Sequence, residues 1–289
     1  MTRINHNITA MITSASLNAN NNALAASLER LSTGLRINRA SDDVAGLSVS
    51  EKIRTQVRGT AVAIRNANDG MALMNIAEGA CNEVSNILQR MRELAIQSDN
   101  DTFSTVERGY ADQEFQSLMA EIQRIALSTQ YNGMTLLDGG PGSFGAMGGA
   151  NSILHIGANF NGGNSLGTID TLAVNIQPIT LGALGMAMTT TSLTTRDAAF
   201  SAIQAVDGAI RSVSTVRSSL GAVTNRLDHA VNNLEIQDTN MTSAESAIRD
   251  VDFASEMTEF TRNQILVQSA TSMLAQANQA PQRVLDLLK

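Results

Sequence analysis

The sequence predicts a mainly α-helical protein: a long antiparallel coiled coil or helical bundle formed by its N- and C-terminal arms, with a small β-hairpin region in the middle. Three observations predict this class. The first 140 residues contain no proline, since the three prolines are Pro141, Pro178 and Pro281. Thirteen of the 21 glycines lie between Gly133 and Gly185. Elsewhere, apolar residues recur at intervals of three and four, which is the spacing of helices packed along a seam.

The apolar series predict how the helical segments are arranged. Four series begin at Leu17, Met71, Phe115 and Ile203, and each continues at heptad-like spacing. As one helix, residues 44–98 would be roughly 80 Å long at the helical rise per residue. That length is too great for a compact domain, so we expect elongated helices that bury their seams against one another.

Capping signals place the starts of two helices. Asp42 and Asp43 precede an apolar run, and acidic residues stabilise the positive end of a helix, so we expect a helix to begin near Val44. Ser104 and Glu107 have the spacing of a capping box, in which each residue satisfies a backbone N–H of the other. This pattern predicts that a second helix begins directly after Ser104.

The C-terminal arm contains a similar pair of signals. Thr242 and Glu245 repeat the capping-box spacing and predict a helix start there. The carboxylates Asp250 and Asp252 are also expected at a helix start, as capping groups rather than as an acid–base pair.

The glycine-rich middle of the chain predicts two short strands. Ile153–Ile156 and Leu172–Ile176 are short apolar runs, and Asn161–Asn164 has the composition of a turn. So small a sheet buries little apolar surface by itself, so we expect it to pack on the helices.

These signals predict five segments. In order they are an N-terminal helix and linker (1–43), a long helical part (44–140), a short glycine-rich β insert (141–194), a return helix (195–240) and a C-terminal helix (241–289).

The two ends of the chain are amphipathic and have no sequence-adjacent partner. We expect the N-terminal arm to pair antiparallel with the C-terminal arm. A lone pair of helices buries only one stripe on each helix, so a single copy would leave apolar faces in water. Large exposed apolar surface marks association, and the sequence therefore predicts a polymer in which the ends pack between copies.

Long motifs in both arms carry a family resemblance. They are Ile4–Asn7, Leu28–Asn38, Asp42–Leu47, Asn68–Gly70, Leu88–Ser98, Gln130–Gly133, Gln264–Leu266, Leu274–Gln279, Pro281–Gln282, Val284–Leu285 and Leu287–Leu288. Together they cover about residues 1–140 and 195–289, and in these segments the chain resembles bacterial flagellin.

The resemblance implies a structural subunit that polymerises into the helical flagellar filament for swimming motility. It implies export through the flagellar type III apparatus, which requires no cleaved signal, and the N-terminus has no signal-peptide pattern. In that family, paired terminal helices line an inner tube, while longer helices and a β-hairpin form an outer tube. The resemblance therefore implies that 1–43 and 241–289 belong to an inner core domain, that 44–140 and 195–240 belong to an outer core domain, and that 141–194 is a reduced variable region. The large variable outer domains are reduced here to about residues 140–195.

The resemblance also implies partners and a location. The partners are copies of the same chain, a flagellar export chaperone, a filament cap and hook–filament junction proteins. The location is the extracellular flagellar filament, or the periplasm in a spirochete-like organism. The residues expected in inner-tube assembly are Ile4, Ile8, Met11, Leu17, Leu24, Leu28, Leu31, Met257, Phe260, Val267, Leu274, Leu285 and Leu288.

A second surface follows from the resemblance. The stretch from Gln89 to Gln97 is similar to the patch bound by the vertebrate Toll-like receptor that recognises flagellin, with Arg90, Leu94 and Glu114 at matching positions. An arginine beside a leucine is a plausible binding hot spot. Packing between subunits is the favoured role of these residues, and receptor binding is a hypothesis about the free subunit.

The sequence argues against an enzyme, a cofactor or a metal site. The GxGxxG pattern at 140–145 lacks the helix that a dinucleotide site requires, and the three histidines, His6, His155 and His229, are widely dispersed. Cys81 lies on an apolar seam and is expected to be a buried structural residue. A net charge of −7 disfavours binding to nucleic acid or to a membrane surface, and no run of residues is apolar and long enough to span a bilayer.

Two other functions remain open from the sequence. A hook–filament junction protein of the flagellin-related class would share the chain ends, although the motif at Arg30–Gly34 favours flagellin itself. A coiled-coil enzyme or chaperone would require stable helices in the isolated ends. Electron microscopy of the purified protein separates the first alternative, because only a filament subunit assembles long filaments alone.

Overall fold

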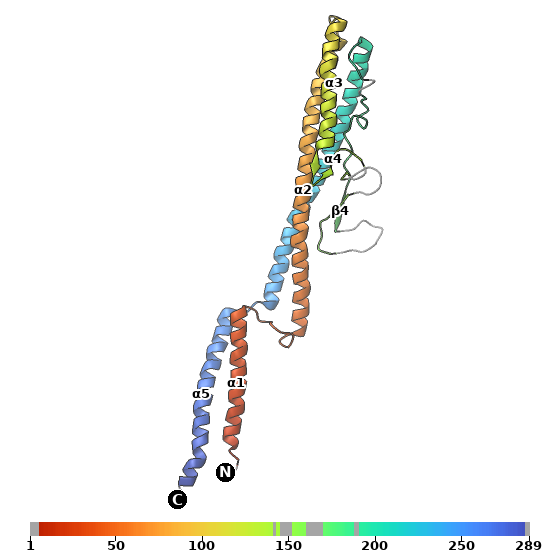
Figure 1. Ribbon diagram of the computed structural model, residues 1–289. Coiled ribbons are helices and arrows are strands. Elements are labelled where there is room, and N and C mark those ends of the chain that lie inside the picture. The colour runs from red at the N-terminus through yellow and green to blue at the C-terminus, as the bar shows by residue number, and fades with distance from the viewer. Residues whose placement is uncertain (1–5, 141–142, 145–151, 160–169, 188–190, 287–289) are drawn as a thin grey trace. The chain divides into compact units, whose positions relative to one another are not determined.

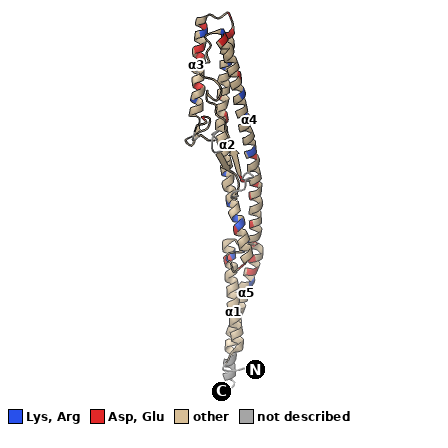
Figure 2. Cartoon of the chain, turned by 90° about the vertical axis from the view of Figure 1, so that its right-hand side faces the viewer, with Lys and Arg blue, Asp and Glu red and all other residues tan. Residues whose placement is uncertain are grey.

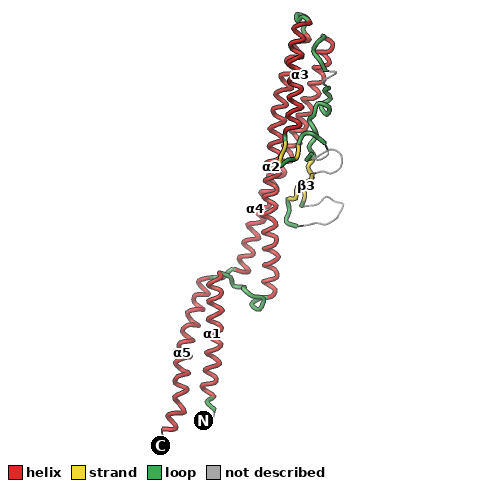
Figure 3. The backbone as a smooth tube through the Cα atoms, in the orientation of Figure 1, coloured by secondary structure: helices red, strands yellow, loops and turns green. Residues whose placement is uncertain are grey.

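The computed structural model describes all residues except 1–5, 141–142, 145–151, 160–169, 188–190 and 287–289, and only the backbone of 280–286. Its helices are α1 (Ile8–Thr33), α2 (Val44–Asp99), α3 (Thr105–Ser128), α4 (Arg196–Arg249) and α5 (Phe253–Asp286). The short strands are β1 (Gln130–Tyr131), β2 (Met134–Thr135), β3 (Ser152–His155) and β4 (Thr171–Val174) (Figures 1 and 3). The predicted mainly helical class, with a small β region in the middle, is confirmed.

The chain folds into two compact units. The first comprises residues 1–55 and 240–289, and the second comprises residues 56–239. The division falls inside α2 and α4, which continue as helices through it.

In the first unit, α1 and α5 run side by side in opposite directions, as predicted (Figure 1). Near the start of α1, the Asn7 side-chain amide donates to the carbonyl of Ala277, at 2.8 Å. Near its end, Arg30 forms an ion pair with Glu256. The two ends of the chain therefore form one antiparallel pair of helices, α1 and α5, which we call the terminal hairpin.

A backbone ladder holds the segments that leave this hairpin. Gly34 ends α1 in the left-handed conformation, with φ 72°, which glycine adopts without steric cost. The Val251 N–H donates to the Gly34 carbonyl at 3.0 Å, and the Arg36 N–H donates to the Arg249 carbonyl at 2.7 Å. These hydrogen bonds tie the end of α1 to the junction between α4 and α5.

The predicted starts of α2 and α3 are confirmed. Asp43 Oδ1 accepts a hydrogen bond from the Gly46 N–H at 2.8 Å. Asp42 accepts instead from the N–H groups of Arg39 and Asn38 in the preceding turn, and these backbone hydrogen bonds, with Arg39 the largest contribution, lower its pKa. At α3, Ser104 and Glu107 form the reciprocal capping box.

The predicted helix start at Thr242 and Glu245 is wrong. Both residues lie inside α4, which continues to Arg249, where each N–H already bonds to a carbonyl one turn earlier. The cap of α5 is Asp252, whose Oδ1 accepts from the Ala254 N–H at 3.0 Å. Asp250 does not cap a helix but pairs with Leu35 in an isolated antiparallel bridge.

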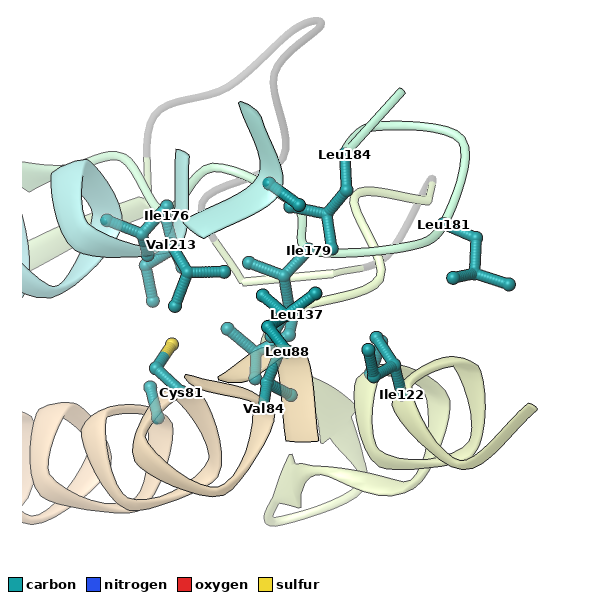
Figure 4. Close-up of a cluster of buried hydrophobic side chains, with 14 of the residues drawn as sticks. Cys81, Val84, Leu88, Ile122, Leu137, Ile176, Ile179, Leu181, Leu184 and Val213 are labelled. Atoms are coloured by element: carbon teal, nitrogen blue, oxygen red, sulfur yellow. The ribbon is translucent and has the colours of Figure 1, made fainter. Parts of the chain in front are cut away.

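The second unit is built around the seams of α2, α3 and α4. Figure 4 shows side chains of α2, including Cys81, Val84 and Leu88, pointing toward residues of α3, α4 and the segment 176–184. Two ion pairs join α2 to α4, Glu78 with Arg217 at 2.9 Å and Arg92 with Asp207 at 2.7 Å. Residues of the three series that begin at Met71, Phe115 and Ile203 therefore pack into one core.

In the described part of the β region, four strands form two antiparallel pairs. In the first, Asn132 (φ 48°) and Gly133 (φ 78°) form the two-residue turn between β1 and β2, a turn that requires positive φ at both positions. In the second, β3 pairs with β4, which confirms the two predicted strands, and Leu172 and Val174 join the helical core. The predicted turn at 161–164 lies outside the described residues.

Among the described residues, no helix has the length and apolar character needed to cross a membrane.

Candidate assembly surface

Helix α1 presents two different faces. One face packs on α5 through Leu17, Leu24 and Leu31, which are half-buried. Ile8, Met11 and Ile12 remain exposed, and the exposed fraction of Ile12 is 62%. Since large apolar side chains in water are unfavourable, these exposed residues need a partner beyond α5.

Helix α5 repeats this division. Phe260, Val267 and Leu274 are half-buried at heptad-like spacing and form its side of the seam with α1. The other faces carry exposed apolar residues. A shallow groove of about 540 Å³ there is lined by Met257, Thr258, Thr261, Arg262, Ile265 and Leu266.

Polar residues interrupt the seam between the two helices. Ser27 of α1 is buried, as are Glu256 and Asn263 of α5. Each occupies a position where an aliphatic side chain would bury more apolar surface. The contact between α1 and α5 is therefore narrow and partly polar, and it stabilises the pair less than a continuous apolar seam would.

Long stretches of α1 and α5 carry no charge. No ionisable side chain occurs between positions 7 and 28 or between positions 263 and 282. Figure 2 shows correspondingly long tan stretches in both helices. Burial of charge is costly unless the charge is paired, so these faces can be covered without that cost.

The assembly residues predicted from the sequence fall into three groups. Those in the seam are Leu17, Leu24, Leu31, Phe260, Val267 and Leu274, and those exposed are Ile8, Met11, Leu28 and Met257. Ile4 and Leu288 lie outside the described residues, and the side chain of Leu285 is also not described.

Five exposed apolar residues of α1 and α5 were not predicted from the sequence: Ile12, Phe253, Ile265, Leu266 and Met273. A signal for one of them was present. Ile8, Ile12, Ala15 and Ala19 form a second apolar series at intervals of four, three and four, displaced around α1 from the leucine series. A helix with two such series has two faces to cover.

The second predicted surface lies on α2 and α3. Arg90 donates from Nε to Glu114 at 3.0 Å and from Nη1 to Glu93 at 3.1 Å. The hydrogen bond to Glu114, followed by that to Glu93, raises the pKa of Arg90. Glu93 was not predicted as part of this surface, although an acidic residue three positions after an arginine on a helix is a usual ion-pair partner.

The other residues of this surface divide by burial. Gln89 and Gln97 are exposed, whereas Leu94 is only 3% exposed and belongs to the core of the second unit. The solvent-facing part of the patch is therefore the Arg90 ion-pair cluster with the two glutamines, and Leu94 packs beneath it.

The described residues contain no group of three or more histidine, cysteine or acidic side chains that could hold a metal ion. Cys81 is fully buried beneath α4, and burial raises the pKa of its thiol to about 11. A thiol in this state is a poor nucleophile, because the thiolate is the reactive form. Cys81 thus serves as a small packing residue, as predicted.

Comparison with known proteins matches both arms of the chain. Residues 4–140 match the bacterial flagellin N-terminal helical region, and residues 203–288 match the bacterial flagellin C-terminal helical region. A flagellin of Halalkalibacterium halodurans is 45% identical over 286 residues, which cover 99% of each chain.

Two further relatives match over the same extent. A flagellin of Bacillus subtilis is 42% identical over 316 residues, covering 99% of this chain and 100% of the relative. The flagellar filament 33 kDa core protein of Treponema phagedenis is 41% identical over 293 residues, covering 99% of each chain. With two long helices paired at the chain ends and apolar faces left uncovered, the chain belongs to the bacterial flagellin family and is a structural subunit of the flagellar filament, not an enzyme.

Proposed function

We propose that the exposed faces of α1 and α5 are the surfaces through which copies of this chain polymerise. The observation that carries the proposal is the double-sided character of both helices: each uses one stripe within the chain and leaves a second apolar stripe in water. Full burial of one large aliphatic side chain contributes about 1.5–3 kcal/mol. Several such residues on each copy, repeated along a polymer, supply a substantial driving force.

The uncharged stretches of these helices support a close packing of many copies. The chain has a net charge of −7, so crowding its charged parts around one axis would cost repulsion. The uncharged stretches 7–28 and 263–282 avoid that cost. Their amide and hydroxyl side chains can form hydrogen bonds with neighbours or with water.

Substitution on the exposed faces tests this proposal. The double variant Ile12→Gln/Ile265→Gln places polar groups on the exposed stripes without touching the seam. We expect it to fold like the unmodified chain and to lose long filaments in electron micrographs. The matched control, Leu17→Ala/Val267→Ala, weakens the seam itself, so its α1 and α5 should become more sensitive to protease. Filaments of normal length from the first variant would contradict the proposal.

Export and assembly partners form a second part of the proposal. We infer that the chain leaves the cytoplasm unfolded through the flagellar type III apparatus, after release from an export chaperone. Outside, its partners are a filament cap and the hook–filament junction proteins. The narrow, partly polar seam supports this route, because a weakly stabilised helical pair unfolds at little cost. The filament is extracellular, or periplasmic in a spirochete-like organism; fractionation of the producing cells distinguishes the two locations.

For the patch of Gln89, Arg90, Gln97 and Glu114, with Leu94 beneath it, we propose a packing contact between subunits. Binding of the free subunit to the vertebrate Toll-like receptor that recognises flagellin is the alternative role. Arg90→Ala removes the centre of the exposed cluster and leaves Leu94 in place, and Arg124→Ala on α3 is the matched control because Arg124 also pairs on the surface, with Glu121. Shortened filaments with Arg90→Ala support packing. A monomeric Arg90→Ala chain that stimulates receptor-bearing cells as strongly as the unmodified monomer rules out the receptor role of this patch.

A further inference from the structure

The exposed apolar residues of α1 and α5 are unusually rich in methionine. Among the described residues of these helices, nine large apolar side chains are exposed, and three of them are Met11, Met257 and Met273. Their exposed fractions are 68%, 49% and 62%. Met257 also lines the shallow groove on α5 described above. The surface proposed above for polymerisation is therefore also a surface of accessible thioethers.

In the second unit, most of the described methionines are buried. Met74, Met91, Met119 and Met186 are each no more than 1% exposed and lie in its core. Of the methionines described there, only Met134, in the β1–β2 hairpin, is as much as 37% exposed. Among the described methionines, those most accessible to reagents that attack thioethers are thus in α1 and α5.

We propose that Met11, Met257 and Met273 form an oxidation-sensitive site that controls whether a free subunit can polymerise. The oxidant class is a peroxide. The thioether sulfur attacks one peroxide oxygen, the S–O bond forms as the O–O bond breaks, and the other oxygen leaves as water after proton transfer. Sulfur is oxidised by two electrons and the peroxide is reduced by two, which gives methionine sulfoxide. This inference rests on the proposed role of α1 and α5 in assembly.

The sulfoxide changes the energetics of assembly. It is polar and must keep a hydrogen-bonding partner when it is removed from water, whereas the thioether needs none. At each of the three positions, packing against another copy would then bury a solvated polar sulfoxide in place of a flexible apolar side chain. Oxidation therefore keeps the subunit free, while methionines already covered within a polymer are shielded from the oxidant.

The experiment compares three samples of the full chain in polymerisation seeded with sheared fragments of its own filament. They are untreated chain, chain treated with hydrogen peroxide, and treated chain then incubated with both methionine sulfoxide reductases. We expect peroxide to raise the critical concentration by at least about tenfold and reduction to restore it. Mass spectrometry should locate the added oxygen at Met11, Met257 and Met273 in free chain, with much less in preformed filaments.

Two variants assign the effect. Met11→Leu/Met257→Leu/Met273→Leu keeps similar apolar volume and should polymerise equally well before and after peroxide. Met134→Leu should remain as sensitive as the unmodified chain. If the triple variant does not polymerise even untreated, the test is whether the methionine sulfoxide reductases restore polymerisation of the peroxide-treated, unmodified chain. Treated chain that polymerises normally while carrying sulfoxide at all three positions overturns the inference, whereas untreated chain that forms no filaments overturns the proposed function instead.

Discussion

Arg30 of α1 and Glu256 of α5 form an incomplete ion pair across the seam of the terminal hairpin. Nη1 of Arg30 lies 3.7 Å from Oε2 of Glu256, and the Glu256 side chain is only 10% exposed. Its second oxygen, Oε1, is buried and has no hydrogen-bond partner among the described residues. Because only one oxygen of this buried carboxylate has a partner, the ion pair favours one alignment of α1 against α5 but adds little to the stability of the seam.

The ion pair leads to a prediction about the stability of the hairpin. Replacing Arg30 by methionine leaves the Glu256 carboxylate without its counter-charge, and we expect a loss of about 1–3 kcal/mol. Arg30 is partly exposed, so solvent screens the ion pair, and we expect a loss in the lower part of this range. Faster hydrogen exchange of the α1 and α5 amides measures the loss. The double variant Arg30→Met/Glu256→Met should recover most of it, and unchanged exchange in the single variant would contradict the prediction.

Two glycines of α2 lead to a second prediction. A Cβ at Gly70 would lie 2.7 Å from Cδ1 of Leu154 in β3, whereas a Cβ at Gly79 would meet nothing within 4 Å. Alanine at the open position should raise the unfolding free energy by about 0.5–1 kcal/mol, because glycine is unfavourable inside helices. At Gly70 the tip of the half-buried Leu154 side chain must move, at a cost of about 0.5–1 kcal/mol, so most of this gain is lost. Urea denaturation of the two variants measures the difference, and equal stabilisation by both would refute it.

The cap of α3 leads to a third prediction. Ser104 Oγ accepts from the Glu107 N–H, and Glu107 accepts in return from the Ser104 N–H. Ser104→Ala removes half of this box and should lower the unfolding free energy by about 1 kcal/mol. Thr242→Ala is the control, because its capping-box spacing lies inside α4, and it should change stability by less than about 0.5 kcal/mol. A similar loss in both variants would mean that the box at Ser104 is not what stabilises the helix.

The contrast between Ser104 and Thr242 shows what the sequence could and could not predict. Both positions carry the same local pattern, and only one begins a helix. The pattern is decisive where backbone N–H groups lack partners, and at Thr242 the preceding turn of α4 already supplies them. The α4–α5 junction is set instead by pairing with the distant segment Gly34–Arg36, which no local pattern contains.

The exposed and buried faces could be predicted only in part. The long seams of α2 and α4 were predictable because one apolar series repeats through many turns. Helix α2 has a further contact with α3, so Leu94, beside the exposed Arg90, is buried although the sequence suggested a surface position. In α1, the leucine series indicated one partner helix, and the second series, from Ile8 to Ala19, which faces solvent, was not recognised beside it. Where a helix has two partners, a single periodic series does not identify both.

The buried thiol of Cys81 makes the second unit sensitive to alkaline pH. Burial raises its pKa from 9.0 to about 11, an effect reduced by the Arg217 cation and increased by Glu78. Because the folded pKa exceeds the unfolded value, the stabilisation is complete below pH 9 and is lost as the pH rises from 9 to 11. The loss amounts to about 2–3 kcal/mol. Denaturation of the unmodified chain and of Cys81→Ala across this interval measures it. The variant starts from a lower stability, since it leaves a small cavity, but it should decline less steeply, and parallel curves would show that Cys81 does not carry the pH dependence.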